Sequence, residues 1–265
     1  MNQAHLGVIG SGAWGTALAH VAVRAGARVT RWAREAEVCA AIEKTRENAL
    51  FLPGVALPAA ISATNDYSAL GACEAFLVTV PTQHLRATLL QARGFLKPHA
   101  PILLCAKGIA RDTLQFADEI AADTIPGHSL SVLSGPSFAV DVASGKPTAI
   151  TLACAQSAIG EYWQARIGLP EFRPYLTSDV RGAEIGGAVK NVLAIACGIA
   201  TGKALGDSAR AALITRGFAE MARLGLALGA KLETLAGLSG LGDLVLTCSS
   251  PQSRNMSLGI AIGEG

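Results

Sequence analysis

The fold of this 265-residue chain is decided by the stretch Gly7-Val8-Ile9-Gly10-Ser11-Gly12-Ala13-Trp14-Gly15-Thr16-Ala17. It joins a short apolar run, typical of a buried strand, to a segment with helical period over residues 17–25. The glycines at this junction form the pattern G-x-G-x-x-G. In such a loop the first glycine makes a tight turn, the second lets a pyrophosphate approach the backbone, and the third lets helix and strand pack closely. We therefore predict a dinucleotide-binding loop that places the anion at the helix N-terminus.

The next expected strand, residues 27–32, helps to choose the cofactor. A site selective for NAD places Asp or Glu about 20 residues beyond the fingerprint, where the carboxylate binds the ribose 2′-hydroxyl. This chain has Arg31 and Arg34 there, and the first acid is Glu35. A guanidinium can hold a 2′-phosphate, which a carboxylate would repel. We therefore expect NADP(H), with NAD(H) as the second candidate; the alternative is that both arginines are simply solvated.

Composition and charge exclude several other classes of protein. The formal net charge is +2, so no strong field attracts nucleic acid or an anionic membrane. Residues 1–5 lead straight into a strand without a signal-peptide pattern, and the longest apolar stretch, 192–200, is too short to span a bilayer. The six cysteines lack paired spacing and indicate a reducing cytoplasm. We expect no metal site, because no HExxH motif or His-rich cluster is present.

Strands and helices alternate along the chain as far as about residue 178. The expected strands cover residues 5–9, 27–32, 61–64, 75–80, 101–105, 130–133 and 147–153. This alternation predicts an α/β fold, with a doubly wound, Rossmann-like domain and a parallel sheet over residues 1–178. Beyond it the strand pattern fades into Ala-, Leu- and Gly-rich helices, so residues 179–265 are assigned to an all-α substrate domain. On its first long helix, 179–203, we expect this apolar stripe to face the core: Val189, Val192, Leu193, Ala196, Ile199 and Ala200.

Polar groups suited to the reduction of a phosphorylated ketone lie outside the glycine loop. Lys107 and the segment 134–139 each follow a predicted strand, at the sheet edge where α/β proteins bind ligands. Lys190 lies on the first long helix, and the segments 237–249 and 253–255 follow. Each has an ordinary structural alternative, such as a solvated lysine, a helix cap or a polar loop. Together they offer cations and amides for a phosphate, and a lysine for the carbonyl proton.

The chain resembles the bacterial NAD(P)-dependent glycerol-3-phosphate dehydrogenases over essentially its whole length. Beside the glycine loop, the resemblance rests on ordered motifs: Asn48-Ala-Leu-Phe-Leu52-Pro53-Gly54, Val80-Pro81-Thr82-Gln83, Lys107-Gly108-Ile109, Ser134-Gly-Pro-Ser-Phe-Ala139, Lys190-Asn191-Val192, Gly240-Leu-Gly-Asp243-Leu and Ser253-Arg254-Asn255. It implies a Rossmann-like domain followed by a helical substrate domain. The implied reaction is the reversible reduction of dihydroxyacetone phosphate to sn-glycerol 3-phosphate, which supplies glycerophospholipid synthesis.

The resemblance also implies roles for the residues at matching positions. Lys190 is implied as the general acid/base, Lys107 as the group that polarises the carbonyl, and Asp243 as the acid that orients the catalytic lysine. The implied cofactor contacts are Gly10, Ser11, Gly12, Ala13, Trp14, Gly15, Arg34, Lys107, Ala139 and Arg254. The implied substrate contacts are Lys107, Gly135, Ser137, Lys190, Asp243, Thr247, Ser253, Arg254 and Asn255, of which the last three grip the phosphate.

One departure from the family and two alternative functions stay open. Family members continue for several tens of residues with a helical segment that carries a Val-Glu-Gly motif, so we expect an incomplete helical domain. The alternative enzyme is another two-domain dehydrogenase, of the 3-hydroxyacid or 6-phosphogluconate kind; an unphosphorylated acid would not need a phosphate grip. A non-catalytic NADP sensor would not need Lys190 and Asp243. We expect a small-molecule substrate, no nucleic acid and no integral membrane segment, with a homodimer as an open assembly.

Overall fold

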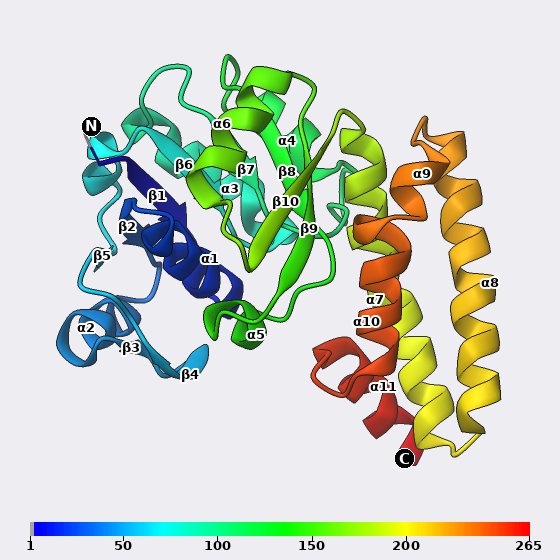
Figure 1. Ribbon diagram of the computed structural model, residues 1–265. Coiled ribbons are helices and arrows are strands. Elements are labelled where there is room, and N and C mark those ends of the chain that lie inside the picture. The colour runs from blue at the N-terminus through cyan, green and yellow to red at the C-terminus, as the bar shows by residue number, and fades with distance from the viewer. Residues whose placement is uncertain (1–2) are drawn as a thin grey trace.

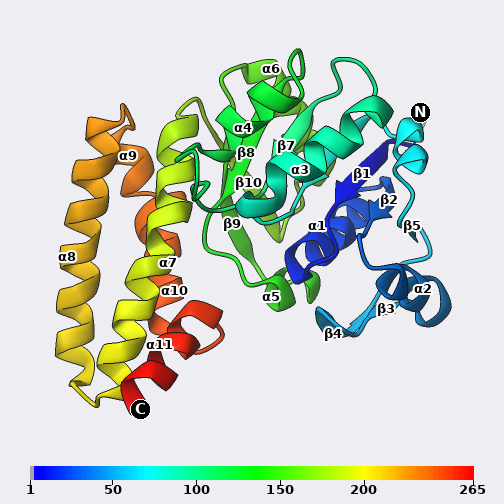
Figure 2. The same ribbon diagram turned by 180° about the vertical axis from the view of Figure 1, so that it is seen from behind.

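The computed structural model describes residues 3–265, and its first part is an eight-stranded sheet with helices on both faces (Figures 1 and 2). Met1 and Asn2, the start of the leaderless N-terminus expected above, lie outside the described residues. The strands are β1 (His5–Ile9), β2 (Arg28–Trp32), β5 (Ile61–Thr64), β6 (Ala75–Val78), β7 (Ile102–Leu104), β8 (Leu130–Ser134), β9 (Thr148–Ala153) and β10 (Phe172–Thr177). Their order in the sheet is β10-β9-β8-β7-β6-β1-β2-β5. The predicted strands lie where the sequence places them; β10 was not predicted.

The sheet is mixed and not wholly parallel, which corrects the expectation for residues 147–153. β9 pairs antiparallel with β8, and β10 runs parallel to β9, so these two strands oppose the other six. The reason lies in the connection after β8. Its helix α5 (Ala139–Ala143) is short and packs on α1 (Ala13–Arg24). Because this connection does not cross a face of the sheet as a long helix, the chain turns back beside β8.

The helices divide between the two faces of the sheet. α1, α5 and α6 (Ser157–Ile167) cover one face, and α3 (Thr82–Ala92) and α4 (Ala117–Thr124) cover the other (Figures 1 and 2). Side chains of β1 pack on both faces of the sheet: Leu6 and Val8 belong to one apolar cluster, and Ile9 belongs to the other. Beyond the β2 and β5 edge lie α2 (Ala36–Thr45) and a hairpin of β3 (Glu47–Asn48) and β4 (Leu52–Ala56). Short 3₁₀ turns cover residues 67–72 and 93–95.

The second part of the chain is entirely helical within the described residues. It consists of α7 (Val180–Gly202), α8 (Gly206–Ala227), α9 (Leu232–Leu235), a π-helical turn η3 (Leu238–Gly242), α10 (Asp243–Ser249) and α11 (Arg254–Glu264). β10 ends at Thr177, so this part starts in the turn around residue 178. The α7 N-terminus is tied to α4, because Glu184 accepts a hydrogen bond from the Asp118 amide at 3.0 Å and Arg181 pairs with Glu119 at 2.7 Å.

The predicted apolar stripe is only part of the buried side of α7: Ala200 is buried, and Val189 and Leu193 pack partly buried against the helical core. Val192 on that stripe is 70% exposed, whereas Lys190, Ala194 and Cys197 are buried. The small side chains of Ala194 and Cys197 let α10 and α11 approach α7 closely. The buried Lys190 ammonium donates hydrogen bonds to Asp243 and Thr247 of α10. By length and mean hydropathy, α7 is the one helix among the described residues that could cross a membrane. In this structure it packs against α8, α10 and α11.

Paired glycines bring α7 and α11 into backbone contact. Gly198 and Gly202 face Gly259 and Gly263, the same four-residue spacing on both helices. A Cβ on Gly198 would collide with the Met256 carbonyl and would lie 2.8 Å from the α-carbon of Gly259. This contact fixes the start of α11 relative to the helix that carries Lys190.

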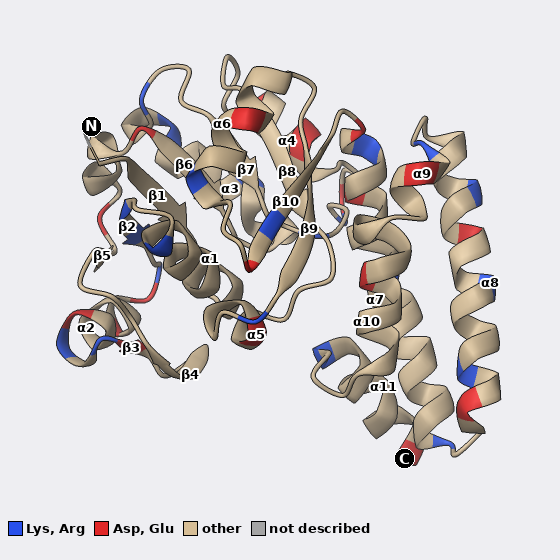
Figure 3. Ribbon diagram, in the orientation of Figure 1, with Lys and Arg blue, Asp and Glu red and all other residues tan. Residues whose placement is uncertain are grey.

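Charged residues of both signs are interspersed over both parts of the molecule (Figure 3). The cysteines are buried and unpaired: Cys39, Cys73, Cys105, Cys154, Cys197 and Cys248.

Candidate active site

The glycine loop between β1 and α1 has the geometry of an anion-binding turn. Gly10 has φ +135°, a conformation that favours glycine, and a Cβ on Gly10 or Gly15 would collide with the Thr79 hydroxyl. At Gly12 a Cβ would meet nothing within 4 Å, so the loop is open on that side. Gly12 is also the N-cap of α1, and no side chain among the described residues caps it. The first amides of α1, from Ala13 on, therefore suit a bound pyrophosphate.

The two arginines near the end of β2 lie in different surroundings. The Arg34 side chain is 76% exposed and pairs with Glu35 at 2.9 Å, and Glu35 accepts a hydrogen bond from the Ser11 hydroxyl at 2.7 Å. Arg34 is therefore within reach of the loop from the solvent side. Arg31 is 0% exposed and donates to the Gly10 and Gly12 carbonyls at 3.1 Å. The expectation that Arg31 offers itself to a 2′-phosphate is wrong, because its side chain turns inward beneath the loop.

Two further residues matched to nucleotide contacts lie near this loop. Trp14 is on the first turn of α1, half-buried against the apolar cluster under the sheet. Ala139 starts α5, which packs on α1, and is also half-buried.

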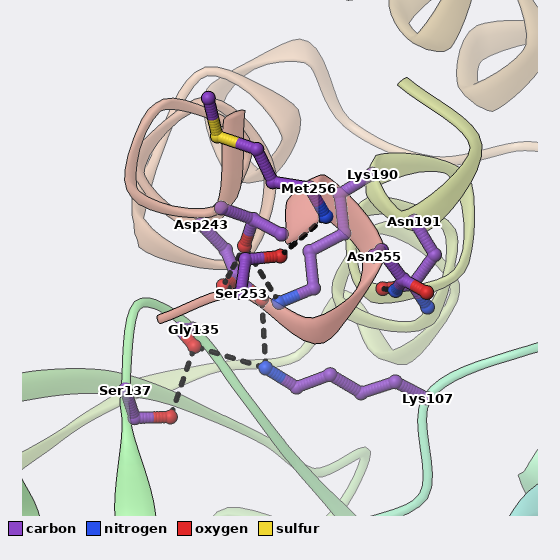
Figure 4. Close-up of polar contacts among 10 residues, drawn as sticks. Lys107, Gly135, Ser137, Lys190, Asn191, Asp243, Ser253, Asn255 and Met256 are labelled. Atoms are coloured by element: carbon purple, nitrogen blue, oxygen red, sulfur yellow. Dashed lines mark hydrogen bonds and ion pairs between the residues drawn. The ribbon is translucent and has the colours of Figure 1, made fainter. Parts of the chain in front are cut away.

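A buried carboxylate joins two lysines from different parts of the chain (Figure 4). Asp243 is 1% exposed; its Oδ2 accepts from Lys107 Nζ at 2.7 Å, and its Oδ1 accepts from Lys190 Nζ at 2.6 Å. Lys107 follows β7, whereas Lys190 and Asp243 belong to α7 and α10. Thr247, one turn after Asp243, accepts from Lys190 Nζ at 3.0 Å and donates to Asp243 Oδ1 at 3.3 Å. The predicted catalytic residues thus form one hydrogen-bonded network.

Glycines allow these elements to meet. A Cβ on Gly187 of α7 would lie 2.9 Å from the Ser134 hydroxyl and 3.2 Å from Lys107 Cγ, so glycine there lets α7 approach the sheet edge. A Cβ on Gly186 would collide with the Ser239 carbonyl in η3, the π-helical turn that leads into Asp243. Such turns occur frequently at functional sites.

The pKa of Lys190 is lowered to about 8, mainly by burial and also by the neighbouring Lys107 ammonium, while Asp243 opposes both effects. An amine with this pKa is largely protonated at neutral pH, yet it can lose its proton at modest cost. That balance suits a group that gives and takes protons near pH 7.

The turn after β8 places a carbonyl and a hydroxyl next to Lys107, in the network around Asp243. The Gly135 carbonyl accepts from Lys107 Nζ at 3.0 Å and from the Ser137 hydroxyl at 3.2 Å (Figure 4). Ser137 is therefore connected to the lysine pair through this carbonyl.

The residues predicted to grip a phosphate lie at the N-terminus of α11, and Figure 4 shows two of them, Ser253 and Asn255, near Lys190. Ser253 is buried and caps the helix, accepting from the Met256 amide at 3.3 Å. Asn255 Nδ2 donates to Asn191 Oδ1 of α7 at 2.8 Å. Arg254 is exposed. The Ser253 hydroxyl is thus engaged in capping, while Arg254 is the exposed cation of the group.

Sequence reasoning missed two residues that support the glycine loop. The motif around Asn48 gives this residue no role, yet its buried amide donates to the Ser11 carbonyl at 2.9 Å and to Thr16 Oγ1 at 2.8 Å. Arg31 was noticed but assigned to the wrong side of the loop. Only the tertiary structure brings β3 against this loop, so no local pattern could have revealed the contact. Within residues 3–265, no group of three or more His, Cys, Asp or Glu side chains could hold a metal ion.

Comparison with known families matches both parts of the chain. Residues 5–159 match the family described as NAD-dependent glycerol-3-phosphate dehydrogenase N-terminus, and residues 179–265 match its C-terminus. The chain belongs to the NAD-dependent glycerol-3-phosphate dehydrogenase family. The resemblance predicted from the motifs is thereby confirmed.

Individual proteins similar to this chain support the same family assignment. The chain is 58% identical to a glycerol-3-phosphate dehydrogenase [NAD(P)+] of Maricaulis maris, over 98% of this chain and 78% of the relative. It is 57% identical to one of Rhodospirillum rubrum, over 100% of this chain and 77% of the relative. The structure also resembles a crystal structure of glycerol-3-phosphate dehydrogenase from Coxiella burnetii, with a TM-score of 0.96 and 39% identity, covering 99% of this chain and 81% of that one. The Rossmann-like fold with a C-terminal helical part is therefore that of the family.

Proposed function

We propose that this protein catalyses the reversible, NAD(P)H-dependent reduction of dihydroxyacetone phosphate to sn-glycerol 3-phosphate. The observation that carries the proposal is the network in which Asp243 binds both Lys107 and Lys190. It joins the carboxyl edge of the sheet to the helical part, in a chain whose family carries this activity in its description. Residues 1–178 form the dinucleotide-binding domain, and residues 179–265 form the substrate domain.

The cofactor binds along the carboxyl edge of the sheet. The loop from Gly10 to Gly15 holds the pyrophosphate, since its helix N-terminus is uncapped by the described side chains and its Gly12 side is open. Trp14, Ala139, Lys107 and Arg254 are further contacts. Arg34 serves a 2′-phosphate, so NADP(H) is the preferred cofactor and NAD(H) the second. When bound, the reduced nicotinamide supplies the hydride that carbon 2 of the ketone receives.

Lys190 acts as the general acid. Its ammonium gives a proton to the carbonyl oxygen of the ketone, and the neutral amine then regains a proton from solvent; in the reverse direction the neutral amine removes the hydroxyl proton. The pKa of about 8 allows both directions near neutral pH. Lys107 polarises the same carbonyl, and Asp243 with Thr247 holds the Lys190 side chain in place through the bonds described above. Gly135 and Ser137 contact the substrate from the sheet side.

The substrate phosphate binds at the start of α11. Arg254 supplies a planar fork of donors there, beside Ser253 and Asn255 at the positive end of an 11-residue helix. A phosphate site at this place argues against a dehydrogenase for an unphosphorylated hydroxyacid. The Lys190 amine argues against a sensor without chemistry, because a pKa of about 8 suits proton transfer near neutral pH, which binding alone does not require.

We further propose a cytoplasmic location, since all six cysteines are free thiols in this structure. The product then serves glycerophospholipid synthesis. A homodimer stays a prediction.

The decisive experiment follows the absorbance of NADPH while dihydroxyacetone phosphate is added. The proposal requires oxidation of NADPH that depends on this substrate and yields sn-glycerol 3-phosphate. Unphosphorylated dihydroxyacetone is the matched control and should react very slowly. Binding of NADPH without turnover of the phosphorylated ketone would support the sensor instead, and turnover of a 3-hydroxyacid would support the other class of dehydrogenase.

A further inference from the structure

The carbonyl groups of the glycine loop are held from below by three side chains of this chain. Arg31 Nε donates to the Gly10 carbonyl and Arg31 Nη2 to the Gly12 carbonyl, both at 3.1 Å. Asn48 Nδ2 donates to the Ser11 carbonyl at 2.9 Å. Thr16 Oγ1 also donates to the Gly12 carbonyl, at 3.0 Å. Three consecutive carbonyls therefore point into the protein, which leaves the amides at the start of α1 for a ligand.

Arg31 is an unusual residue for this position because its charge is buried without a carboxylate bonded to it. Its side chain is 0% exposed, and Nη1 has no hydrogen-bond partner among the described residues. Glu35, the acid whose charge acts on Arg31, is bonded to Ser11 and Arg34 instead. Burial lowers the pKa of Arg31 to about 10, which leaves the guanidinium charged at neutral pH. Burying such a cation is costly when no anion compensates it.

We propose that Arg31 is a positioning residue for the dinucleotide pyrophosphate: it orients the glycine loop and places a buried positive charge directly beneath it. This inference rests on the proposed function and deepens it. The bound pyrophosphate is the anion that compensates the buried guanidinium across the loop. The arginine thus acts on the cofactor through the loop backbone and through its charge, while Arg34 is left to serve the 2′-phosphate.

The stability of the ligand-free protein distinguishes this role from a merely structural one. A side chain kept only for stability should weaken the free protein when it is lost. A buried cation without a bonded carboxylate costs stability in the free protein, so its replacement by an apolar side chain of similar length should cost little there. The effect should instead appear when the anionic ligand binds.

The test measures the binding of three probes by calorimetry. NADPH contains both the pyrophosphate and the 2′-phosphate, ADP-ribose contains only the pyrophosphate, and adenosine 2′-monophosphate contains only the 2′-phosphate. In Arg31→Met we expect the dissociation constants of NADPH and ADP-ribose to rise by about tenfold or more, the size of one charge-assisted contact. The constant for adenosine 2′-monophosphate should change less than about twofold, since this probe does not reach the loop. Arg28→Met, an exposed arginine on the same strand, is the matched control and should leave all three constants unchanged.

The melting temperature of the ligand-free protein provides the second measurement. Arg31→Met should keep it within about 4 °C of the parent, while the rise on adding NADPH becomes smaller. If Arg31→Met does not fold, Arg31→Lys is compared in the same way; it keeps the charge and should weaken NADPH and ADP-ribose by a smaller factor, again without affecting adenosine 2′-monophosphate.

Three results would overturn the inference. They are unchanged NADPH and ADP-ribose binding in a folded Arg31 variant, equal weakening of all three probes, and a large loss of melting temperature in both folded Arg31 variants without ligand. The assay for reduction of dihydroxyacetone phosphate tests the proposed function independently of these binding measurements. A parent protein that binds NADPH but does not reduce dihydroxyacetone phosphate contradicts the function and leaves the binding comparison valid.

Discussion

Replacing Asp243 by Asn tests the centre of the proposed mechanism. The substitution keeps the shape of the side chain but removes the only carboxylate that bonds both lysines among the described residues. An opposite charge in contact shifts a pKa by about 1–3 pH units. Loss of Asp243 should therefore lower the pKa of Lys190 from about 8 to about 6. At pH 7.5 the protonated fraction then falls from about three quarters to about 3%, roughly 25-fold.

The direction of the pH dependence follows from the role of Lys190 as an acid. Reduction of the ketone needs the protonated amine, so its rate falls as the pH rises through the pKa. The parent should lose activity above about pH 8, and Asp243→Asn should lose it above about pH 6. At pH 7.5 we expect kcat/KM for reduction to fall about 25-fold or more, with partial recovery toward pH 6. The assay is NADPH oxidation from pH 5.5 to 9.5 in buffers of constant ionic strength.

Stability should change as well, because two ammonium groups lose their buried partner. Breaking such a pair lowers the free energy of unfolding by about 3–5 kcal/mol, measurable by urea denaturation. Asp207→Asn is the matched control: it makes the same change in charge at a side chain that is 89% exposed and paired with Arg210. It should alter neither the pH profile nor the stability. A folded Asp243→Asn enzyme with the parent's kcat/KM and an unshifted pH profile would refute the reasoning.

Three further substitutions test single residues. Lys190→Ala should lower kcat by about 10²–10⁴ while NADPH still binds in a fluorescence titration; a near-normal kcat would move the acid role to Lys107 or to water. Arg34→Asp should shift preference from NADPH toward NADH, and an unchanged ratio of kcat/KM for the two cofactors would contradict a 2′-phosphate contact. Arg254→Lys should raise KM for dihydroxyacetone phosphate and lower kcat, because a point charge replaces a planar fork. Its slow rate with unphosphorylated dihydroxyacetone should hardly change, and equal slowing with both substrates would assign Arg254 to the cofactor or the fold.

The sequence predicted those features that depend on local pattern. The strand at residues 5–9, the glycine loop and the change to helices near residue 178 follow from periodicity and from glycine spacing, and the structure has them at these places. The orientation of β9 did not follow, since residues 147–153 look the same in a parallel or an antiparallel strand. β10 was missed because its pattern, with Pro174 inside it, is not that of a regular strand.

The candidate site, too, was predictable in part. Its residues came from motifs, but their mutual contacts came from tertiary structure. The sequence does not say that Lys190 and Asp243, 53 residues apart, share a hydrogen bond. Nor does it say fully which side of α7 is buried: Val192 was expected inside but is exposed, and the small residues around Lys190 are buried. Arg31 shows the same limit, because a strand pattern gives the face of a side chain but not the direction of a long guanidinium.

The glycine pairs between α7 and α11 imply a rule for the length of the substrate. Helices that touch backbone to backbone can shift along each other only by steps near one turn, about 5.4 Å, because intermediate positions would break the glycine contact. The proposed acid lies on α7 and the proposed phosphate site at the start of α11, so their spacing changes in such steps and not continuously. The site should therefore select ketones by the number of atoms between carbonyl and phosphate. A ketone phosphate that is longer by one carbon between these groups should react poorly even where there is room for the extra atom.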